Sequence, residues 1–306
     1  MLSFRSALLF VLLAAVFAVA VHYLVGWREV LRAWSHVSVP LAGGAVLLML
    51  ASYASRAARL MSYLRRAVRV KFWPAMRVTL VHNLFNHVLP FRTGEVSFPI
   101  LLKRAFDVDV GRSVVTLMWF RLLDASIVFG VGGALLSLTH LPHAEWIALL
   151  MAAALSPVVL YVLRPQMELR LASIGNARVK RVLAAMLSAI PPSVPAMLID
   201  TMWTFLNWAF KLAALALVLL AFVSTAPTTA GIAVVGGELA SFISAPVPAG
   251  LGTYEAGIVA PLVLAGIPAV DAIKAAVNVH LMLLTTAMIL GFGALATRPP
   301  PEARRQ

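Results

Sequence analysis

The sequence has no cysteine and few charged residues, and each of these facts excludes some classes of protein. Of its 306 residues, 12% are charged and 61% are hydrophobic, whereas soluble domains carry about 25% charged residues. The lack of cysteine excludes disulfides, thiolate metal ligands and cysteine nucleophiles. No polar stretch is long enough to form a soluble domain with its own core. We therefore predict one polytopic membrane domain, residues 1–306, of the all-α integral membrane class.

Apolar runs of about 18 or more residues predict membrane-spanning helices. Such runs occur near residues 6–25, 40–55, 113–139, 146–163, 196–223 and 274–297. They predict six full spans. The first run follows Arg5 and ends in Ala18-Val19-Ala20, a pattern shared by uncleaved anchors and by cleavable signal peptides. We favour the uncleaved anchor.

The net charge of +13 comes from short basic runs between apolar segments, which is the arrangement of orientation signals in membrane proteins. Short cytoplasmic loops hold the excess of lysine and arginine. The densest run contains Arg56, Arg59, Arg65, Arg66, Arg69, Lys71 and Arg77. Further groups are Lys103, Arg104 and Arg112; Arg164, Arg170, Arg178, Lys180 and Arg181; and Arg298, Arg304 and Arg305. With these groups inside, both termini are expected in the cytoplasm of a bacterium, and the protein in its inner membrane.

Two segments must then leave and return on the same side of the membrane. Residues 78–104 lie between two cytoplasmic basic groups, and residues 230–266 lie between two outside loops. Each has a tip of proline and glycine, which break a helix and free backbone polar groups. The tip residues are Pro90, Gly94, Pro248, Gly250 and Gly252. We predict two re-entrant hairpins from opposite faces; a pair of short full spans is the alternative for the second.

An inverted repeat is a further expectation. After each hairpin tip come an apolar leg, a short turn and another spanning helix, which indicates repeats over residues 40–139 and 196–297. An odd number of crossings separates the copies, so they would be inverted. Inverted repeats whose broken helices meet near the bilayer midplane are typical of many secondary transporters. The alternative is a chance alignment of proline, glycine and small residues.

Ionisable residues at membrane depth are functional candidates, because each costs at least a few kcal/mol unless it is paired or hydrated. Arg92 and Glu95 flank the first tip, Asn86 precedes it, and Glu255 follows the second tip. The Arg92 guanidinium could bind a phosphate through two hydrogen bonds. The two glutamates could hold an amine or take up a proton.

Arg121 and Asp124 lie three residues apart on one face of the predicted 113–139 helix. One interpretation is a structural ion pair between them. The other makes Arg121 the partner of a lipid phosphate or of Glu95. The predicted substrate-binding residues are therefore Asn86, Arg92, Glu95, Arg121, Asp124 and Glu255.

Other polar residues at depth are ambiguous. Asp200, Asn207 and Lys211 form a stripe along the 196–223 helix, which either faces the same cavity or makes a buried hydrogen-bond network. Packing is the simpler interpretation of three more, Glu238, Asn278 and His280.

Several kinds of chemistry lack sequence support. His82 and His87 are five residues apart, so their imidazoles do not share one helical face and no metal site is expected. The sequence has no phosphate-binding loop of ATPases, no serine-hydrolase elbow and no zinc-protease motif. We therefore predict no catalytic residue and no cofactor.

Three features together resemble the transmembrane region of lysylphosphatidylglycerol synthases, over nearly the whole chain. They are the segment Asn86 to Glu95 with Pro90 and Gly94, the helix with Arg121 and Asp124, and the motif Pro248-Ala249-Gly250-Leu251-Gly252-Thr253-Tyr254-Glu255. Full-length members add a soluble aminoacyl-transferase domain that makes the lipid, and the membrane part is held to move it between leaflets. The sequence ends at Gln306 without that domain, so the resemblance implies lipid translocation and not lysyl transfer. Arg92 stands where many relatives are expected to have glycine.

The leading hypothesis is a non-enzymatic flippase of the inner membrane that moves a polar or anionic lipid without hydrolysing ATP. Its expected partners are membrane lipids, whether anionic phospholipids, aminoacylated phospholipids or other envelope lipids such as hopanoids, and no nucleic acid. A lipid-synthesising enzyme or a second copy of the chain stays open as a protein partner. A proton gradient acting through Glu95 or Glu255 is one conceivable energy source. The alternative hypothesis is an accessory subunit, or an intramembrane transferase that uses a carboxylate as a general base on lipid-linked substrates.

Overall fold

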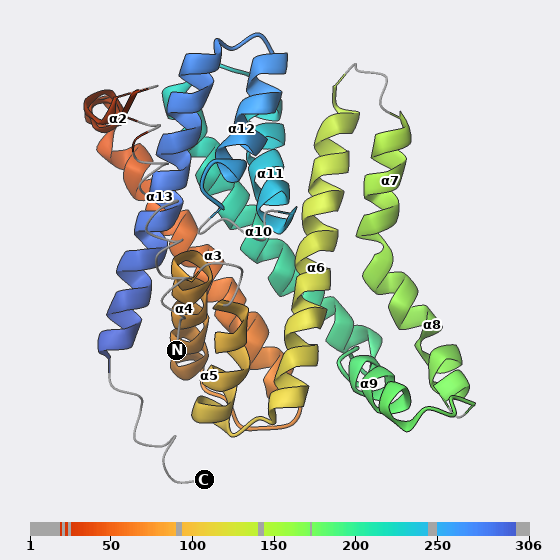
Figure 1. Cartoon of the computed structure of the whole chain (residues 1–306). Helices are drawn as coiled ribbons and strands as arrows, with labels where there is room; N and C mark the ends of the chain where they lie inside the picture. The colour runs from red at the N-terminus through yellow and green to blue at the C-terminus, as the bar shows by residue number, and fades with distance from the viewer. Residues whose placement is uncertain are drawn as a thin grey trace.

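A computed structural model of the chain shows a bundle of helices (Figure 1). It describes residues 19, 22–23, 26–89, 94–139, 144–171, 173–243 and 250–297, and these ranges contain no strand. The prediction of an all-α membrane protein is confirmed by this architecture and by the apolar helices within it.

The helices fall into three consecutive groups along the chain. The first contains α2 (Trp27–Ala33), the short 3-10 helix η1 (Trp34–His36), α3 (Val39–Leu64), α4 (Phe72–Val88), α5 (Ser97–Phe106) and α6 (Val110–Ser137). The second contains α7 (Ala144–Ala154), α8 (Ser156–Leu171) and α9 (Ala177–Ser188). The third contains α10 (Val194–Phe222), α11 (Pro227–Ile243), α12 (Thr253–Leu264) and α13 (Ala269–Ala296).

Local sequence signals set several of these helix ends. The Asp109 carboxylate accepts a hydrogen bond from the Arg112 backbone N–H at 3.1 Å and so caps the start of α6. The Ser193 hydroxyl caps α10 in the same way, and a proline follows in the first turn. The chain leaves α5 at Asp107, whose φ of 55° lies in the left-handed region that stops a helix.

Four helices are long and apolar enough to cross a membrane: α3, α6, α10 and α13. The bent pair α7 and α8 would make a fifth, with an angle of 49° between its halves. The bend follows from Pro157, which has no N–H to donate to the preceding turn. The predicted first span, residues 6–25, lies mostly outside the described residues. The described part therefore supports a multi-pass membrane protein with four or five spans, and the count of six is not confirmed.

The two predicted hairpins correspond to α4 with α5 and α11 with α12. In Figure 1, α4 and α5 occupy the lower half of the molecule and α11 and α12 the upper half. Helix α12 has 12 residues and α5 has 10. At 1.5 Å per residue neither exceeds about 18 Å, well short of a hydrocarbon core of about 30 Å. These lengths favour hairpins that enter from opposite ends and turn back.

The succession of helix lengths from α3 to α6 is repeated from α10 to α13. Helices α3 to α6 have 26, 17, 10 and 28 residues, and helices α10 to α13 have 29, 17, 12 and 28. Contacts are matched in part: α3 packs along α10, α4 packs on α13, and α11 packs on α6. The inverted repeat stays a prediction, with which this order agrees.

Glycines allow the legs of the second hairpin to touch. A Cβ atom on Gly236 of α11 would overlap the carbonyl oxygen of Gly257 of α12, and the converse also holds. Small residues at a crossing point let two helix backbones approach closely in a membrane, where dispersion contacts drive helix association. This crossing fixes how α12 carries Tyr254 and Glu255 into the bundle.

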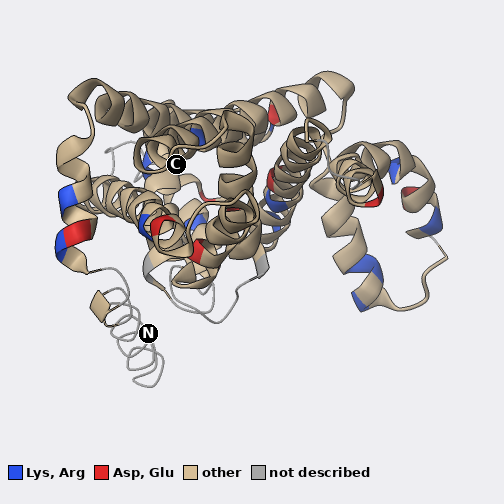
Figure 2. Cartoon of the chain, turned by 90° about the horizontal axis from the view of Figure 1, so that it is seen from above, with Lys and Arg blue, Asp and Glu red and all other residues tan. Residues whose placement is uncertain are grey.

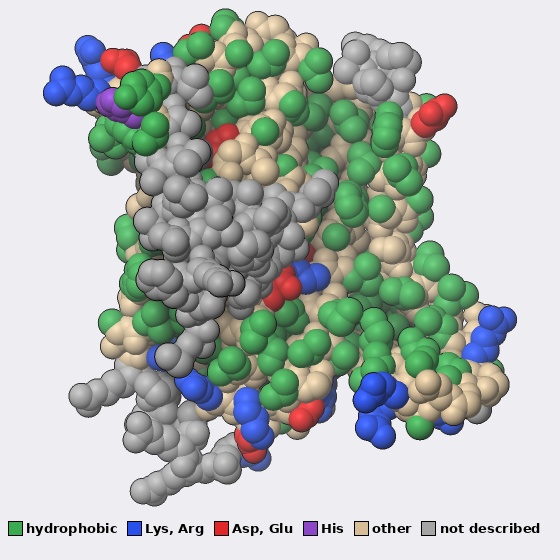
Figure 3. All heavy atoms as spheres, viewed as in Figure 1, with side chains coloured by type: hydrophobic (Ala, Val, Ile, Leu, Met, Phe, Trp, Pro, Cys, Tyr) green, Lys and Arg blue, Asp and Glu red, His purple; other side chains and the backbone are tan. Residues whose placement is uncertain are grey.

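Most basic residues lie at one end of the molecule. The connections between α3 and α4, α5 and α6, and α8 and α9 all lie at the lower end in Figure 1. Figure 3 shows most of its visible Lys and Arg side chains along this lower edge, below a wide apolar band. Two arginines of the predicted cytoplasmic run are exceptions, because Arg56 and Arg59 lie within the bundle.

Helices α7, α8 and α9 stand at one side of the bundle, at the right of Figures 1 and 2. They contact α6 among the described helices. An apolar groove of about 580 Å³ lies between α6, α8 and α9, and its lining includes Trp119, Leu160, Met167 and Met186. It is separate from the charged cavity described next.

Candidate functional site

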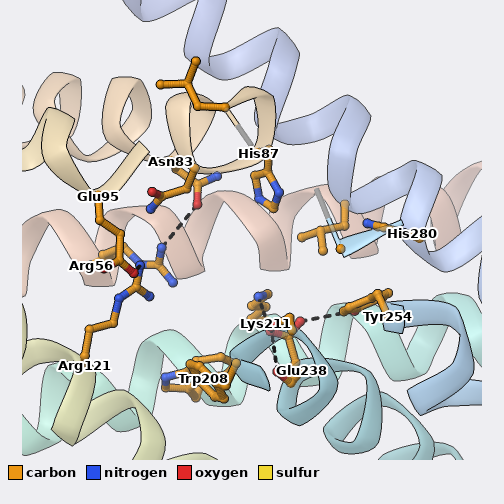
Figure 4. A pocket seen from close by; sticks show the side chains of 16 residues that line it. Arg56, Asn83, His87, Glu95, Arg121, Trp208, Lys211, Glu238, Tyr254 and His280 are labelled. Atoms are coloured by element: carbon orange, nitrogen blue, oxygen red, sulfur yellow. Dashed lines mark hydrogen bonds and ion pairs between the residues drawn. The ribbon is translucent and has the colours of Figure 1, made fainter. Parts of the chain in front are cut away.

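A cavity of about 140 Å³ lies between the two hairpins. Helices α3, α4, α6, α10, α11, α12 and α13 all contribute to its wall, with the segments just after α4 and just before α5 and α12. The lining residues are Arg56, Asn83, Asn86, His87, Leu89, Glu95, Arg121, Trp208, Lys211, Glu238, Ser241, Phe242, Gly250, Tyr254, His280 and Leu283. Figure 4 shows the charged members grouped on two sides of it.

One charged group joins the first hairpin to α6. Glu95 lies in the helical turn that precedes α5, and its carboxylate Oε1 is 3.0 Å from Nη2 of Arg121 on α6. The two side chains are 31% and 35% exposed, so this pair is the most open of those that line the cavity. A partly hydrated ion pair at this position can exchange one partner for a ligand at a modest cost.

The second charged group joins α10, α11 and α12. Lys211 Nζ lies 2.7 Å from Oε2 of Glu238, and their side chains are 13% and 4% exposed. Glu238 also accepts a hydrogen bond from the Tyr254 hydroxyl at 3.2 Å. The Lys211 ammonium lies over the Trp208 ring, 4.9 Å from its centroid. The Lys211 ammonium of this network therefore contacts both the Glu238 carboxylate and the Trp208 ring.

Glu255 performs two tasks at the second hairpin tip. Its Oε2 accepts a hydrogen bond from the backbone N–H of Gly252 at 2.7 Å, which caps α12. Its Oε1 lies 2.7 Å from Nδ1 of His280 on α13, whose ring packs on Tyr254. The Nε2 atom of His280 is buried and has no hydrogen-bond partner among the described residues. Glu255 therefore acts at the cavity through His280, which lines it.

Arg56 on α3 is the surplus cation of the cavity. Its Nη1 donates a hydrogen bond to the Asn83 side-chain oxygen at 3.3 Å. Within the described part of the chain it has no ion-pair partner, and its buried Nε has no hydrogen-bond acceptor. Figure 4 shows Arg56 beside Arg121 and Glu95.

A chain of hydrogen bonds ties α4 to the described end of the first tip. Asn86 contacts Nε2 of His82 at 3.1 Å, and Nδ1 of His82 contacts the Ser97 hydroxyl at 3.0 Å. Ser97 in turn donates to the Gly94 carbonyl at 2.5 Å. A Cβ on Gly94 would overlap the α4 backbone at Phe85 and Asn86. The hairpin therefore requires glycine at this position.

The predicted pairing within α6 is replaced by pairings between helices. Asp124 does not bond to Arg121; its Oδ1 lies 2.7 Å from Nη1 of Arg59 on α3. The Trp208 indole N–H also donates to Asp124, at 3.1 Å. Arg121 takes the other predicted role, as the partner of Glu95. Both side chains thus pair with groups on neighbouring elements and not with each other.

The predicted polar stripe on α10 also divides among different partners. Asp200 pairs with Arg66 at 2.6 Å, and Asn207 accepts a hydrogen bond from Ser52 at 2.9 Å. Only Lys211 of the three lines the cavity. Asp200 thus joins α10 to the segment just after α3, and Asn207 joins α10 to α3 itself.

The predicted binding residues thus have different positions. Asn86, Glu95, Arg121 and Gly250 line the cavity, whereas Glu255 and Asp124 do not line it but each contact a residue that does, His280 and Trp208 respectively. Gly252 precedes α12 with a φ of 84°, a left-handed conformation that favours glycine. Pro90, Arg92 and Pro248 lie outside the described residues. Among the described residues, no three His, Asp or Glu side chains form a metal-binding group.

Sequence reasoning missed Arg56, and it attributed Glu238 and His280 to packing. In the sequence, Arg56 begins the basic run that follows the predicted 40–55 span, which predicts a cytoplasmic loop there. Helix α3 in fact continues to Leu64, so Arg56 lies more than two turns before its end. The burial of Ser52, Tyr53 and Arg59 along this helix is visible only in the structure, so the basic run in the sequence hid the continuation.

Comparison with known families identifies the family of the chain. The family model described as lysylphosphatidylglycerol synthase TM region matches residues 7–291 of the 306-residue chain. No curated protein matches the sequence.

Proposed function

The chain belongs to the lysylphosphatidylglycerol synthase transmembrane-region family, and from this premise we propose that it moves a polar or anionic lipid between the leaflets of a bacterial inner membrane. In this proposal the head group passes through the charged cavity while the acyl chains stay in the bilayer. The lipid is not chemically converted, and no ATP is hydrolysed. The end with most of the arginines and lysines faces the cytoplasm, as the distribution of positive charge in membrane proteins suggests.

The observation that carries the proposal is the position of the cavity. It lies where two short hairpins from opposite ends of the bundle approach each other, and three cations and two carboxylates line it. A charged side chain at membrane depth costs free energy, and such residues are therefore found mainly where they line a pathway or a binding site. Broken helices that meet at mid-depth are the usual place for polar substrates in transporters. A head group in the cavity would replace water as the partner of these charges.

The openness of the first charged group supports the same function. Glu95 and Arg121 are each about one third exposed, whereas Lys211 and Glu238 are nearly closed off. In Figure 3, an acidic and a basic side chain lie together in the middle of the apolar face. A polar opening at this depth is what a head group needs to enter sideways from the bilayer.

Translocation of labelled lipids in proteoliposomes tests the proposal. Fluorescent phosphatidylglycerol and aminoacylated phosphatidylglycerol are incorporated, and leaflet sidedness is followed with a membrane-impermeant quencher. We expect wild-type protein to accelerate exchange of at least one lipid. The double variant Glu95→Gln, Glu255→Gln should slow it by about tenfold or more, because each change leaves a cation or a helix end without its carboxylate.

Glu145→Gln is the matched control, because Glu145 is an exposed glutamate at the start of α7. It should transport as wild type does. No acceleration of any lipid by the wild type would contradict the proposal. Chemical conversion of the added lipid would instead favour a transferase.

A further inference from the structure

Cationic and acidic side chains do not balance on the first hairpin's side of the cavity. Arg121 pairs with Glu95 and Lys211 pairs with Glu238. Arg56 is left over, with no ion-pair partner in the described ranges. Glu255 contacts Nδ1 of His280 at the second tip, away from Arg56 and Arg121. The first hairpin's side of the cavity therefore holds one positive charge more than its neighbours neutralise.

Unused hydrogen-bond donors lie on the same side. An arginine has five N–H donors in a fixed fork, and Arg56 is seen to use one of its donors, to Asn83. The Nε atoms of Arg56 and Arg121 are both buried without an acceptor among the residues described. A buried donor without a partner costs about 1–3 kcal/mol. An anion with several oxygens would satisfy both guanidinium groups together.

The other side of the cavity is less suited to an anion. Lys211 is held by Glu238 and lies over the Trp208 ring. An anion placed there would meet the Glu238 carboxylate and would have to displace it. In Figure 4, Arg56 and Arg121 lie together with Asn83 above them, and Lys211 and Glu238 lie across the cavity. The side with Arg56 and Arg121 is therefore the better place for an anion, and the side with Lys211 and Glu238 is not.

We infer that Arg56, assisted by Arg121, forms a phosphate subsite that selects lipids with a phosphate in the head group. This inference rests on the proposed function and deepens it. A guanidinium binds a phosphate through two parallel hydrogen bonds, which an ammonium cannot reproduce. The phosphate of a bound lipid neutralises Arg56, while Glu95 stays on Arg121 and keeps the subsite from becoming doubly positive.

Equilibrium binding to the purified full chain in nanodiscs of neutral lipid tests the inference. The probes are fluorescent phosphatidylglycerol and fluorescent diacylglycerol with the same acyl chains, so that they differ in the phosphoglycerol head group. Wild type should prefer phosphatidylglycerol. Arg56→Gln should lower that preference by about tenfold, equivalent to about 1.4 kcal/mol, and leave diacylglycerol binding unchanged. Arg56→Lys should lower it by a smaller factor, because it keeps the charge and loses the fork.

Arg69→Gln is the matched control, since Arg69 is an exposed arginine in the connection between α3 and α4. It removes the same charge and should bind as wild type does. If Arg56→Gln does not fold, Arg56→Lys carries the test by itself. Competition with inorganic phosphate separates the two sources of the anion: displacement by phosphate as strong as by unlabelled phosphatidylglycerol would overturn the lipid assignment.

Failure of the inference and failure of the proposed function give different results. Unchanged phosphatidylglycerol preference in Arg56→Gln, with translocation by wild type intact, would overturn the phosphate subsite alone. Absence of both lipid binding and translocation in wild type would overturn the proposed function, and the subsite with it.

Discussion

The buried charge of Arg59 is stabilised inside the bundle by several neighbouring side chains. Its guanidinium contacts the Asp124 carboxylate, donates to Thr204 at 3.0 Å and lies over the Phe120 ring at 4.3 Å. Side chains from α6 and α10 thus surround a residue of α3. A buried ion pair is costly to break, because the remaining charge keeps its desolvation cost and loses its partner.

We therefore predict that Asp124→Asn lowers the free energy of unfolding by about 3–5 kcal/mol, because it leaves the Arg59 charge uncompensated. The thermal unfolding temperature of the protein in detergent measures the loss. Glu168→Gln is the control, since it breaks the pair of Glu168 with Arg164, in which Glu168 is 46% exposed. That change should alter stability by less than about 1 kcal/mol. Equal stability of Asp124→Asn and wild type would contradict the prediction.

The residues of the cavity could be predicted only in part from the sequence. Glu95 and Arg121 were identifiable, because an ionisable residue within an apolar run or beside a proline and glycine tip is conspicuous. Arg56 was not, because neighbouring arginines in the sequence made it resemble a loop residue. The partner of Asp124 was also out of reach, since a contact between α3 and α6 depends on how the helices are arranged and not on spacing within one helix.

The hairpin of α11 and α12 depends on glycine where its two helices cross. Their backbones meet at Gly236 and Gly257, where an added methyl group would overlap a carbonyl oxygen. Tyr254 and Glu255 lie on the first turn of α12, so this crossing also sets the position of the second charged group.

Gly257→Ala is expected to separate α11 from α12 and to lower stability by about 1–3 kcal/mol, the usual cost of overpacking. Lipid translocation should fall as well, because the Tyr254 hydroxyl moves away from Glu238. Gly293→Ala in α13 is the control: a Cβ there meets no atom within 4 Å, and alanine favours a helix by about 1 kcal/mol. Thermal unfolding and the proteoliposome assay measure both. A Gly257→Ala protein with full stability would refute the close packing.

Helix identities were largely predictable from apolar runs, and helix ends and bends were not. The hairpins could be expected because proline and glycine interrupt apolar sequence at two places. The bend between α7 and α8 was missed, although Pro157 lies inside the predicted 146–163 span. A proline within a long apolar run can kink a helix or be absorbed by neighbouring helices, and the sequence does not distinguish these outcomes.

At the scale of the whole molecule, the basic connections lie at one end, and the end of α6, the start of α7 and the connection between α10 and α11 lie at the other. The sequence predicted that the basic connections would share one end, because lysine and arginine are concentrated in the loops on one side of a membrane protein. It did not predict how the helices between them pack.

The absence of native cysteine makes this division measurable with single introduced cysteines. We predict that Ser224→Cys, between α10 and α11, reacts with a membrane-impermeant maleimide in intact spheroplasts. Arg69→Cys, between α3 and α4, should react only after the membrane is permeabilised. Both positions are exposed, so access to the reagent depends on the side of the membrane. Labelling of both from the same side would contradict the proposed orientation.

The approach of two hairpins from opposite ends also has an electrical consequence. A membrane voltage falls across the layer that separates the two aqueous phases, and one elementary charge moved through 100 mV gains about 2.3 kcal/mol. Because charged and polar side chains line the cavity between the hairpins, we expect that layer to be thinner there and the field within it to be stronger. Arg56 and any charged head group beside it would lie in this field. We therefore expect the cell's resting potential to bias the direction in which a charged lipid crosses, without any fuel molecule.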